Sequence, residues 1–380
     1  MIIPYSKQWI TSRDVKFVTS ALKQKIITQG KYVENFESSV SKYVASKYSL
    51  SVNSASSALL LCCHILGLKK GDIAWTVPIT YAATANCILL TGASLDFVDI
   101  DINTFNISIK ELEQKLSLAK KNKKLPKIII PVHIAGEPCD MNKIYQLSKK
   151  YKFKIIEDAS HAFGSKYNGL PVGSCAYSDL TVFSFHPVKT ITTGEGGCIT
   201  TNSKKYFKLG KSLRSGGIVK DKKELIRKNP PKWYYEQHFL GYNFRMSDIN
   251  AALGLSQLKR IKIFQKKRED IKKNYIKYLK ILPVKFQQSS YDNKSSNHLF
   301  ILILKNRRNE LYQYLRKSNI ECNLNYIPLY KHPFYKKKFS KKFKNSEIYY
   351  RSALSIPIFP QLKKKEQRSI ILKIKKFLLN

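Results

Sequence analysis

The alternation of hydrophobic and polar positions divides much of the chain into short apolar runs and longer amphipathic stretches. Six runs are short, bounded and rich in β-branched or aromatic side chains, as buried strands are: residues 48–52, 73–77, 95–100, 127–133, 154–157 and 180–185. Four stretches between them have the spacing of helices: residues 54–68, 81–91, 108–119 and 142–151. Strands that alternate with helices pair in parallel, so the pattern predicts an α/β fold with a doubly wound, helix-covered sheet.

The N-terminal segment precedes this alternation and follows another pattern. Residues 2–29 predict an arm and a first helix, for which Ser12 is a candidate N-cap and Gly30 a candidate end. Residues 32–46 predict a second helix.

The C-terminal part of the chain also departs from the alternation. From Met246 onward the pattern predicts one long helix to about Tyr278, followed by a mixture of strands and helices. We therefore expect an N-terminal arm and large domain over residues 1–245. Residues 246–380 are expected to form a connecting helix and a smaller C-terminal α+β domain.

The composition is that of an ordinary folded protein. With 380 residues, of which 43% are hydrophobic, the chain can form one large core and a smaller second one. The N-terminus has no uninterrupted apolar segment, and the longest apolar run, residues 58–68, is too short to span a bilayer. The seven cysteines lack the spacing of zinc ligands. We expect a cytoplasmic protein with buried thiols, no metal and no membrane anchor.

The formal net charge of +42 is the most prominent feature of the composition. Such a charge fits nucleic-acid binding, an acidic membrane surface or the attraction of an anionic metabolite. Most of the excess is lysine scattered along the whole chain, and no nucleic-acid-binding module is recognisable. A solvated surface is therefore the favoured interpretation, followed by steering of a phosphorylated substrate.

Two predicted strands end in side chains that carry chemistry. Lys189 follows the strand over residues 180–185, and Asp158 follows the strand over residues 154–157. In open α/β sheets, ligands bind at the carboxyl ends of strands. A lysine that forms a Schiff base and a carboxylate that keeps a pyridinium nitrogen protonated are what pyridoxal phosphate requires. Taken alone, an ion pair at the strand ends would be the simpler interpretation.

Further residues strengthen the cofactor hypothesis. Residues 52–59 (VNSASSAL) combine a strand with a hydroxyl-rich helix start, an arrangement that binds phosphate but is also typical of any N-cap. Ser184 adds a hydroxyl at the same sheet edge. Tyr81 could stack on a planar ring or belong to the core. His161 and His186 are candidates for hydrogen bonds to the cofactor, and a structural role is equally compatible with His186.

Six segments together resemble the DegT/StrS-type nucleotide-sugar aminotransferases. They are VNSASSAL (52–59), PITYAATAN (78–86), EDASHAFGS (157–165), VFSFHPVKTITTGEGG (182–197), GYNFRMSDINAALGLSQL (241–258) and SSNHLF (295–300). The resemblance covers nearly the whole chain. It implies pyridoxal 5'-phosphate as cofactor and the fold type I, aspartate-aminotransferase-like architecture. That architecture has a large domain with a mostly parallel seven-stranded sheet and a smaller C-terminal α+β domain.

The resemblance also implies roles for residues around the cofactor. Lys189 matches the Schiff-base lysine, Asp158 the partner of the pyridine nitrogen, and His161 a residue close to the ring hydroxyl. Tyr81 matches a residue against the face of the ring. The phosphate is expected to contact Ala55, Ser56 and Ser184.

The resemblance further implies a homodimer with two shared active sites. Asn243 matches a residue that reaches the phosphate from the other subunit. The predicted contacts to the nucleotide-sugar are Tyr5, Gln29, Lys31, His186, Tyr326 and His332. Within the family, the motifs are most similar to the pseudaminic-acid pathway branch. Its members transfer an amino group from L-glutamate to C4 of a UDP-linked 4-keto-6-deoxy-N-acetylhexosamine.

Two departures from the family pattern bear on the sugar. Gly216 stands where relatives often have histidine, and residues 218–238 are longer than expected. The alternatives within the family are amination of another 4-keto or 3-keto nucleotide-sugar, as in perosamine, legionaminic acid or bacillosamine synthesis. Related dehydratases have histidine in place of the lysine, so Lys189 excludes that reaction. A basic nucleic-acid-binding protein and a non-catalytic cofactor-binding regulator are the alternatives from other classes.

Overall fold

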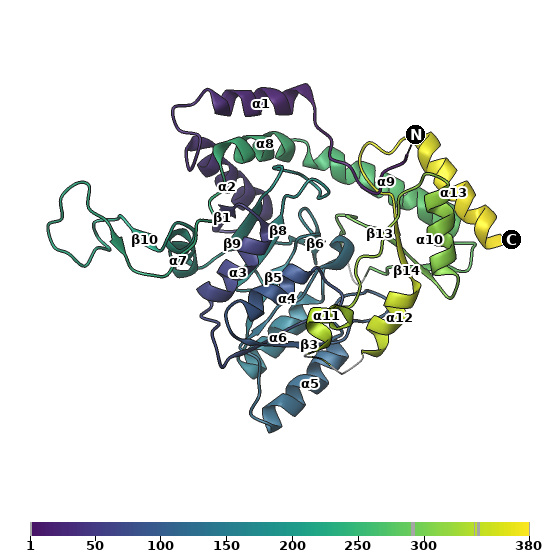
Figure 1. Ribbon diagram of the computed structural model, residues 1–380, viewed down its shortest axis with the longest axis horizontal. Coiled ribbons are helices and arrows are strands. Elements are labelled where there is room, and N and C mark those ends of the chain that lie inside the picture. Colours follow the sequence, from purple (N-terminus) through teal and green to yellow (C-terminus); the bar gives the residue numbers. More distant parts are fainter. Residues whose placement is uncertain (1, 290–292, 338, 340–342, 380) are drawn as a thin grey trace.

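A seven-stranded, mostly parallel sheet forms the centre of the protein (Figure 1). The computed structural model describes residues 2–289, 293–337, 339 and 343–379. The strand order is β1-β9-β8-β5-β4-β2-β3. The strands are β1 (Tyr48–Val52), β2 (Ile73–Thr76), β3 (Ser94–Phe97), β4 (Ile128–Ile129), β5 (Lys154–Asp158), β8 (Leu180–Ser184) and β9 (Gly197–Thr201). β9 runs antiparallel to both neighbours and the other pairs are parallel, which confirms the predicted α/β fold.

Helices pack on the sheet through two separate apolar clusters. The helices that follow β1 in this part of the chain are α3 (Ala55–Ile65), α4 (Ala82–Leu89), α5 (Ile109–Lys121), α6 (Met141–Tyr151) and α7 (Lys204–Arg214). Ile128 and Ile156 belong to the cluster that contains the apolar side chains of α3, whereas Ile129 and Ile155 belong to the cluster of α5 and α6. Alternate residues of a strand point to opposite faces, so both faces of the sheet are buried and a continuous apolar run forms each central strand.

The N-terminal arm leads into two helices, α1 (Ser12–Leu22) and α2 (Lys31–Val44). The prediction that Ser12 is the N-cap is wrong by one residue, because Thr11 is extended and its N–H donates to the Asp14 carboxylate at 2.8 Å. Gly30 does not end the first helix but is the N-cap of α2. Its N–H donates to Asp248 at 2.7 Å, and a Cβ at Gly30 would lie 2.5 Å from that carboxylate.

The predicted long helix after Met246 is two helices. They are α8 (Asp248–Leu258) and α9 (Ile261–Leu279). At the break, the Arg260 guanidinium donates to the carbonyl of Trp9 at 3.0 Å and forms an ion pair with Asp14. The break between α8 and α9 is therefore accompanied by contacts with the N-terminal arm. The hydrophobic periodicity of residues 248–279 does not predict it.

A second, smaller sheet lies in the C-terminal part of the chain. It is antiparallel, with β12 (Val284–Phe286), β13 (Phe300–Leu304) and β14 (Ala353–Ile356). The helices of this part of the chain are α10 (Arg308–Lys317), α11 (Pro333–Lys336), α12 (Lys344–Ser352) and α13 (Lys364–Leu379). Other short elements include η1 (Ile134–Gly136), β6 (Lys166–Tyr167), β7 (Leu170–Pro171) and η2 (Leu329–Lys331). Apolar side chains of α9, α10 and α13 pack with this sheet in one cluster.

A two-stranded hairpin extends away from the rest of the molecule, at the left of Figure 1. It is formed by β10 (Ile218–Val219) and β11 (Glu236–Gln237). These strands lie in residues 218–238, the segment that is longer than the family pattern predicts. Large apolar side chains are exposed on and beside it, among them Trp233 (76%) and Leu240 (88%).

All seven cysteines are buried as free thiols, as predicted. Among the described residues, no helix combines the length and the apolar character that crossing a membrane requires.

Candidate active site

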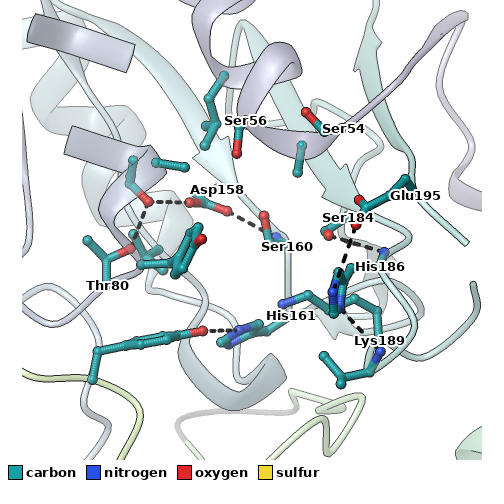
Figure 2. Close-up of a pocket in the computed structure, with 18 residues that line it drawn as sticks. Ser54, Ser56, Thr80, Asp158, Ser160, His161, Ser184, His186, Lys189 and Glu195 are labelled. Carbon is teal, nitrogen blue, oxygen red and sulfur yellow. Dashed lines mark hydrogen bonds and ion pairs between the residues drawn. The ribbon is translucent and has the colours of Figure 1, made fainter. Parts of the chain in front are cut away.

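A cavity of about 480 Å³ opens at the carboxyl ends of β5 and β8 (Figure 2). Nine residues predicted for the site line it: Ala55, Ser56, Tyr81, Asp158, His161, Ser184, His186, Lys189 and Tyr326. They come from the starts of α3 and α4, from two neighbouring strands of the sheet and from the segment before η2. The sheet topology therefore brings together residues that are distant in the sequence.

Lys189 and Asp158 line the same cavity because the strands that precede them are parallel neighbours. Asp158 is the last residue of β5, which pairs with β8, and Lys189 lies in the turn after β8. Burial lowers the pKa of Lys189 to about 8, although the negative charge of Asp158 acts in the opposite direction. At this pKa, Lys189 is a neutral amine in about one molecule in ten at pH 7, far more often than an ordinary lysine.

Asp158 is fixed by donors from two segments. Thr84 donates its hydroxyl to one carboxylate oxygen at 2.7 Å, and the N–H of Ser160 donates to the other at 3.1 Å. Thr80 and Thr84 share a further hydrogen bond of 2.7 Å. Thr84 is a site residue for which no role was predicted from the sequence. Its signal was the position three residues after Tyr81, in the first turn of the helix that begins there.

The neighbouring carboxylate, Glu157, faces the other side of the strand. It lies 2.8 Å from Nε2 of His133 and accepts hydrogen bonds from Ser178 (2.5 Å) and Thr181 (2.9 Å). Because successive side chains of a strand alternate between the two faces, one of the two adjacent carboxylates reaches the cavity.

His161 is held by a hydrogen bond at each ring nitrogen. Its Nδ1 accepts from the N–H of Ala135 at 3.3 Å, and its Nε2 lies 3.0 Å from the hydroxyl of Tyr326. Burial, together with the nearby charge of Lys189, lowers the pKa of His161 well below its usual value. The ring is therefore neutral, and the hydrogen bond at Nδ1 assigns its proton to Nε2.

The start of α3 offers free backbone donors to the cavity. Ser54 is the N-cap and accepts from the N–H of Ser57 at 3.1 Å, while the N–H groups of Ala55 and Ser56 precede any acceptor that the helix itself provides. A Cβ at Gly197 would lie 2.6 Å from the backbone of Ser54 and Ala55, so glycine permits β9 to lie against this helix start. Exposed N–H groups at a helix N-terminus bind phosphate.

These residues fit pyridoxal phosphate. The cavity presents an amine of lowered pKa, a carboxylate and a phosphate-binding helix start on one sheet edge. One acidic residue that the sequence analysis did not assign, Glu195, also lines the cavity, with its carboxylate 4.0 Å from Nε2 of His186. In the described ranges, no group of three or more histidine, cysteine or acidic side chains could hold a metal ion.

Five residues predicted for the site do not line this cavity: Tyr5, Gln29, Lys31, Asn243 and His332. Gln29 donates its side-chain amide to Ser215 at 3.2 Å, and the backbone of Ser215 forms a bridge with Asn243. Tyr5 donates its hydroxyl to Asn325 at 2.7 Å, next to a residue of the cavity. The functional roles of these five residues stay predictions.

Comparisons with known proteins identify the family of the chain. The sequence profile of the DegT/DnrJ/EryC1/StrS aminotransferase family matches residues 8–375. A UDP-4-amino-4,6-dideoxy-N-acetyl-beta-L-altrosamine transaminase of Campylobacter jejuni is 39% identical over 393 residues, covering 99% of each protein.

Two solved structures extend the agreement to the fold. Helicobacter pylori PseC, an aminotransferase of pseudaminic acid biosynthesis, superposes with a TM-score of 0.91 at 30% identity and covers 100% of both chains. The putative sugar aminotransferase Spr1654 of Streptococcus pneumoniae, in its PLP form, gives 0.89 at 28% identity and covers 99% of this chain and 98% of its own. The chain thus belongs to the DegT/DnrJ/EryC1/StrS aminotransferase family and is a pyridoxal-phosphate-dependent sugar aminotransferase.

Proposed function

We propose that this enzyme transfers the amino group of L-glutamate to C4 of a UDP-linked 4-keto-6-deoxy-N-acetylhexosamine. The sugar is UDP-2-acetamido-2,6-dideoxy-β-L-arabino-hex-4-ulose, and the reaction belongs to pseudaminic acid and surface-glycan biosynthesis in the cytoplasm. The observation that carries the proposal is the end-to-end similarity to the Campylobacter jejuni transaminase, whose name specifies a 4-amino-4,6-dideoxy UDP-sugar. The presence of Lys189 supports amino transfer over the dehydration known in related enzymes.

The chemistry of the cofactor determines what the side chains must do. Pyridoxal phosphate, when bound, supplies an electron sink that acidifies the α-proton of an amino acid. In our proposal, the Asp158 carboxylate, which Thr84 and Ser160 hold in place, keeps the ring nitrogen protonated. The N–H groups of Ala55 and Ser56, with the Ser184 hydroxyl, bind the phosphate. His161 would lie close to the ring hydroxyl.

Lys189 has two tasks in this proposal. Its amine would hold the cofactor covalently, and the free amine would move a proton at the α-carbon of the amino donor. Both tasks require the neutral amine. The lowered pKa of about 8 supports this role, because it raises the neutral fraction at pH 7 by about 300-fold over an ordinary lysine.

The cofactor-free protein should reveal this pKa directly. Trace labelling with acetic anhydride at different pH values, followed by peptide mass spectrometry, is expected to give Lys189 a titration midpoint near pH 8. Below the midpoint the amine is protonated and unreactive, and above it the amine is neutral and reacts. Lys266 provides a control in the same sample, because its hydrogen bond with Asp270 raises its pKa. A midpoint for Lys189 equal to that of Lys266 would contradict the proposed role.

We also propose that the enzyme is a homodimer with shared active sites, in which Asn243 of one subunit reaches the phosphate bound by the other. Support comes from the exposed apolar side chains of the hairpin, Trp233 and Leu240, which lie close in sequence to Asn243. Light scattering is expected to give about twice the chain mass of 43.8 kDa. A monomer at micromolar concentration would contradict the shared site.

The choice of sugar is tested by a panel of substrates. UDP-, GDP- and dTDP-linked 4-keto-6-deoxysugars are supplied with L-glutamate, and the products are identified by mass spectrometry. We expect amination of the UDP-linked N-acetylhexosamine. Products from GDP- or dTDP-linked sugars alone would overturn the proposed substrate and leave the family intact. Salt-dependent DNA binding without turnover, or bound cofactor without amino transfer, would favour a nucleic-acid-binding or a regulatory protein instead.

A further inference from the structure

The ring of His298 packs against the ring of His161. His298 has no role in the function proposed above. It belongs to the SSNHLF segment (residues 295–300), which leads into β13 at Phe300. The side chain is 3% exposed, and its ring centroid lies 4.4 Å from that of His161, with the planes inclined by 43°. His161 is thus flanked by two rings, because the ring of Tyr326 lies at 6.0 Å with an inclination of 23°.

Hydrogen bonds join His298 and the residues before it to His161 and to η1, the turn that also binds His161. The N–H of His298 donates to the carbonyl of Ala135 at 2.9 Å, and the N–H of Ala135 donates to Nδ1 of His161. Ser296 donates its hydroxyl to the carbonyl of His161 at 2.6 Å. A Cβ at Gly136 would lie 2.1 Å from that hydroxyl. Glycine therefore permits this close approach of the two segments.

On the opposite side, His298 is tied to helix α9. Arg268 is buried, and its guanidinium donates to the carbonyl of His298 at 3.2 Å and to that of Ile358 at 2.8 Å. The backbone of His298 is thus fixed by η1 on one side and by α9 on the other. Its ring has little freedom to move away from His161.

Both imidazoles are neutral. Burial lowers the pKa of His298 well below its usual value, and the nearby His161, Lys189, Arg268 and His186 lower it further. The Nδ1 atom of His298 is buried without a hydrogen-bond partner among the described residues. The ring therefore contributes to the site mainly through contact of its face.

The geometry points to His298 as a positioning residue that fixes the plane and the tautomer of His161 against the cofactor. The χ2 torsion of histidine is broad, so the plane of its ring has to be set by packing and hydrogen bonds. Contact with the ring of His298 keeps His161 in the one plane in which Nδ1 meets the N–H of Ala135 and Nε2 meets Tyr326. This inference rests on the proposed role of His161 and is independent of the sugar.

The test compares His298→Ala, which removes the ring, with His298→Phe, which keeps a ring of similar shape. In the cofactor-free protein, ¹⁵N chemical shifts of labelled histidine should show one tautomer of His161 in the wild type and in His298→Phe. In His298→Ala we expect an average of the two tautomers. In the loaded enzyme, His298→Ala should lower kcat about 10- to 100-fold, with KM for the sugar within about threefold.

A second measurement covers the case in which His298→Phe does not fold. In a His161→Asn background, His298→Ala should cause no further loss of kcat, because it acts through His161. Tyr275→Phe is the control for general destabilisation: it removes a buried hydrogen bond to Pro357 at 2.8 Å and should lower Tm without changing the histidine shifts.

Each contrary outcome has a separate meaning. A wild-type tautomer and wild-type kcat in His298→Ala would overturn the positioning role, as would additive losses in the double variant. A folded His298→Phe that behaves like His298→Ala would also overturn it. Wild-type turnover in His161→Asn would instead overturn the role that the proposed function gives to His161.

Discussion

Replacement of Lys189 by alanine is expected to lower kcat by at least about 10⁴-fold. The variant loses the amine that, in the proposed function, both attaches the cofactor and moves the proton, and no other lysine lines the described cavity. Steady-state turnover with L-glutamate and an accepted keto-sugar gives kcat. Borohydride reduction followed by peptide mapping should locate the covalently bound cofactor on Lys189 in the wild type and on no residue in the variant.

Lys166→Ala provides the matched control for this change. Lys166 lies on β6, is exposed and does not line the cavity. Its replacement removes one positive charge from a chain of net charge +42 and should leave kcat unchanged within about twofold. Multiple turnovers by Lys189→Ala, or a reduced cofactor on another lysine, would contradict the assignment.

Asp158→Asn should have the second largest effect, a loss in kcat of about 10³-fold. Asparagine keeps the size of the side chain and an oxygen that can accept from Thr84, but it removes the negative charge. In the proposed function, the ring nitrogen of the cofactor then lacks the partner that would keep it protonated. Because the charge of Asp158 raises the pKa of Lys189, the labelling midpoint of Lys189 should move to a lower pH in this variant.

Thr84→Val separates the charge from the hydrogen bond. Valine has the shape of threonine and leaves the carboxylate in place with one donor fewer, so a loss of about tenfold in kcat is expected. If Thr84→Val and Asp158→Asn lower kcat equally, the orientation of the carboxylate and not its charge would be the dominant contribution.

Short-range sequence patterns predicted most of the large sheet. They also predicted that Asp158 and Lys189 lie in one cavity. Apolar runs bounded by turn residues correspond to β5 and β8. Because parallel strands present their carboxyl ends at one edge of a sheet, the sequence alone predicts that Asp158 and Lys189 share a site. The helix start at Ala55 was recognisable because capping has a local sequence signal.

Features that depend on contacts between distant segments could not be predicted in the same way. The antiparallel direction of β9 and the break between α8 and α9 are set by neighbours that the local sequence does not contain. The roles inferred for Thr84 and His298 depend on the residues that they contact, Asp158 and His161 respectively. A hydroxyl in a helix or an imidazole before a strand carries no such information by itself.

The opposite orientation of Glu157 and Asp158 has a consequence for the register of β5. A slip of this strand by one residue would exchange its two faces, turning Glu157 toward the cavity and Asp158 toward His133. A slipped strand would still offer the cavity a carboxylate, displaced along the strand from Thr84. The buried contacts of Glu157 with His133, Ser178 and Thr181 therefore stabilise the observed register of β5 against such a slip. Accurate placement of Asp158 in the cavity thus depends on a polar cluster on the opposite face of the strand.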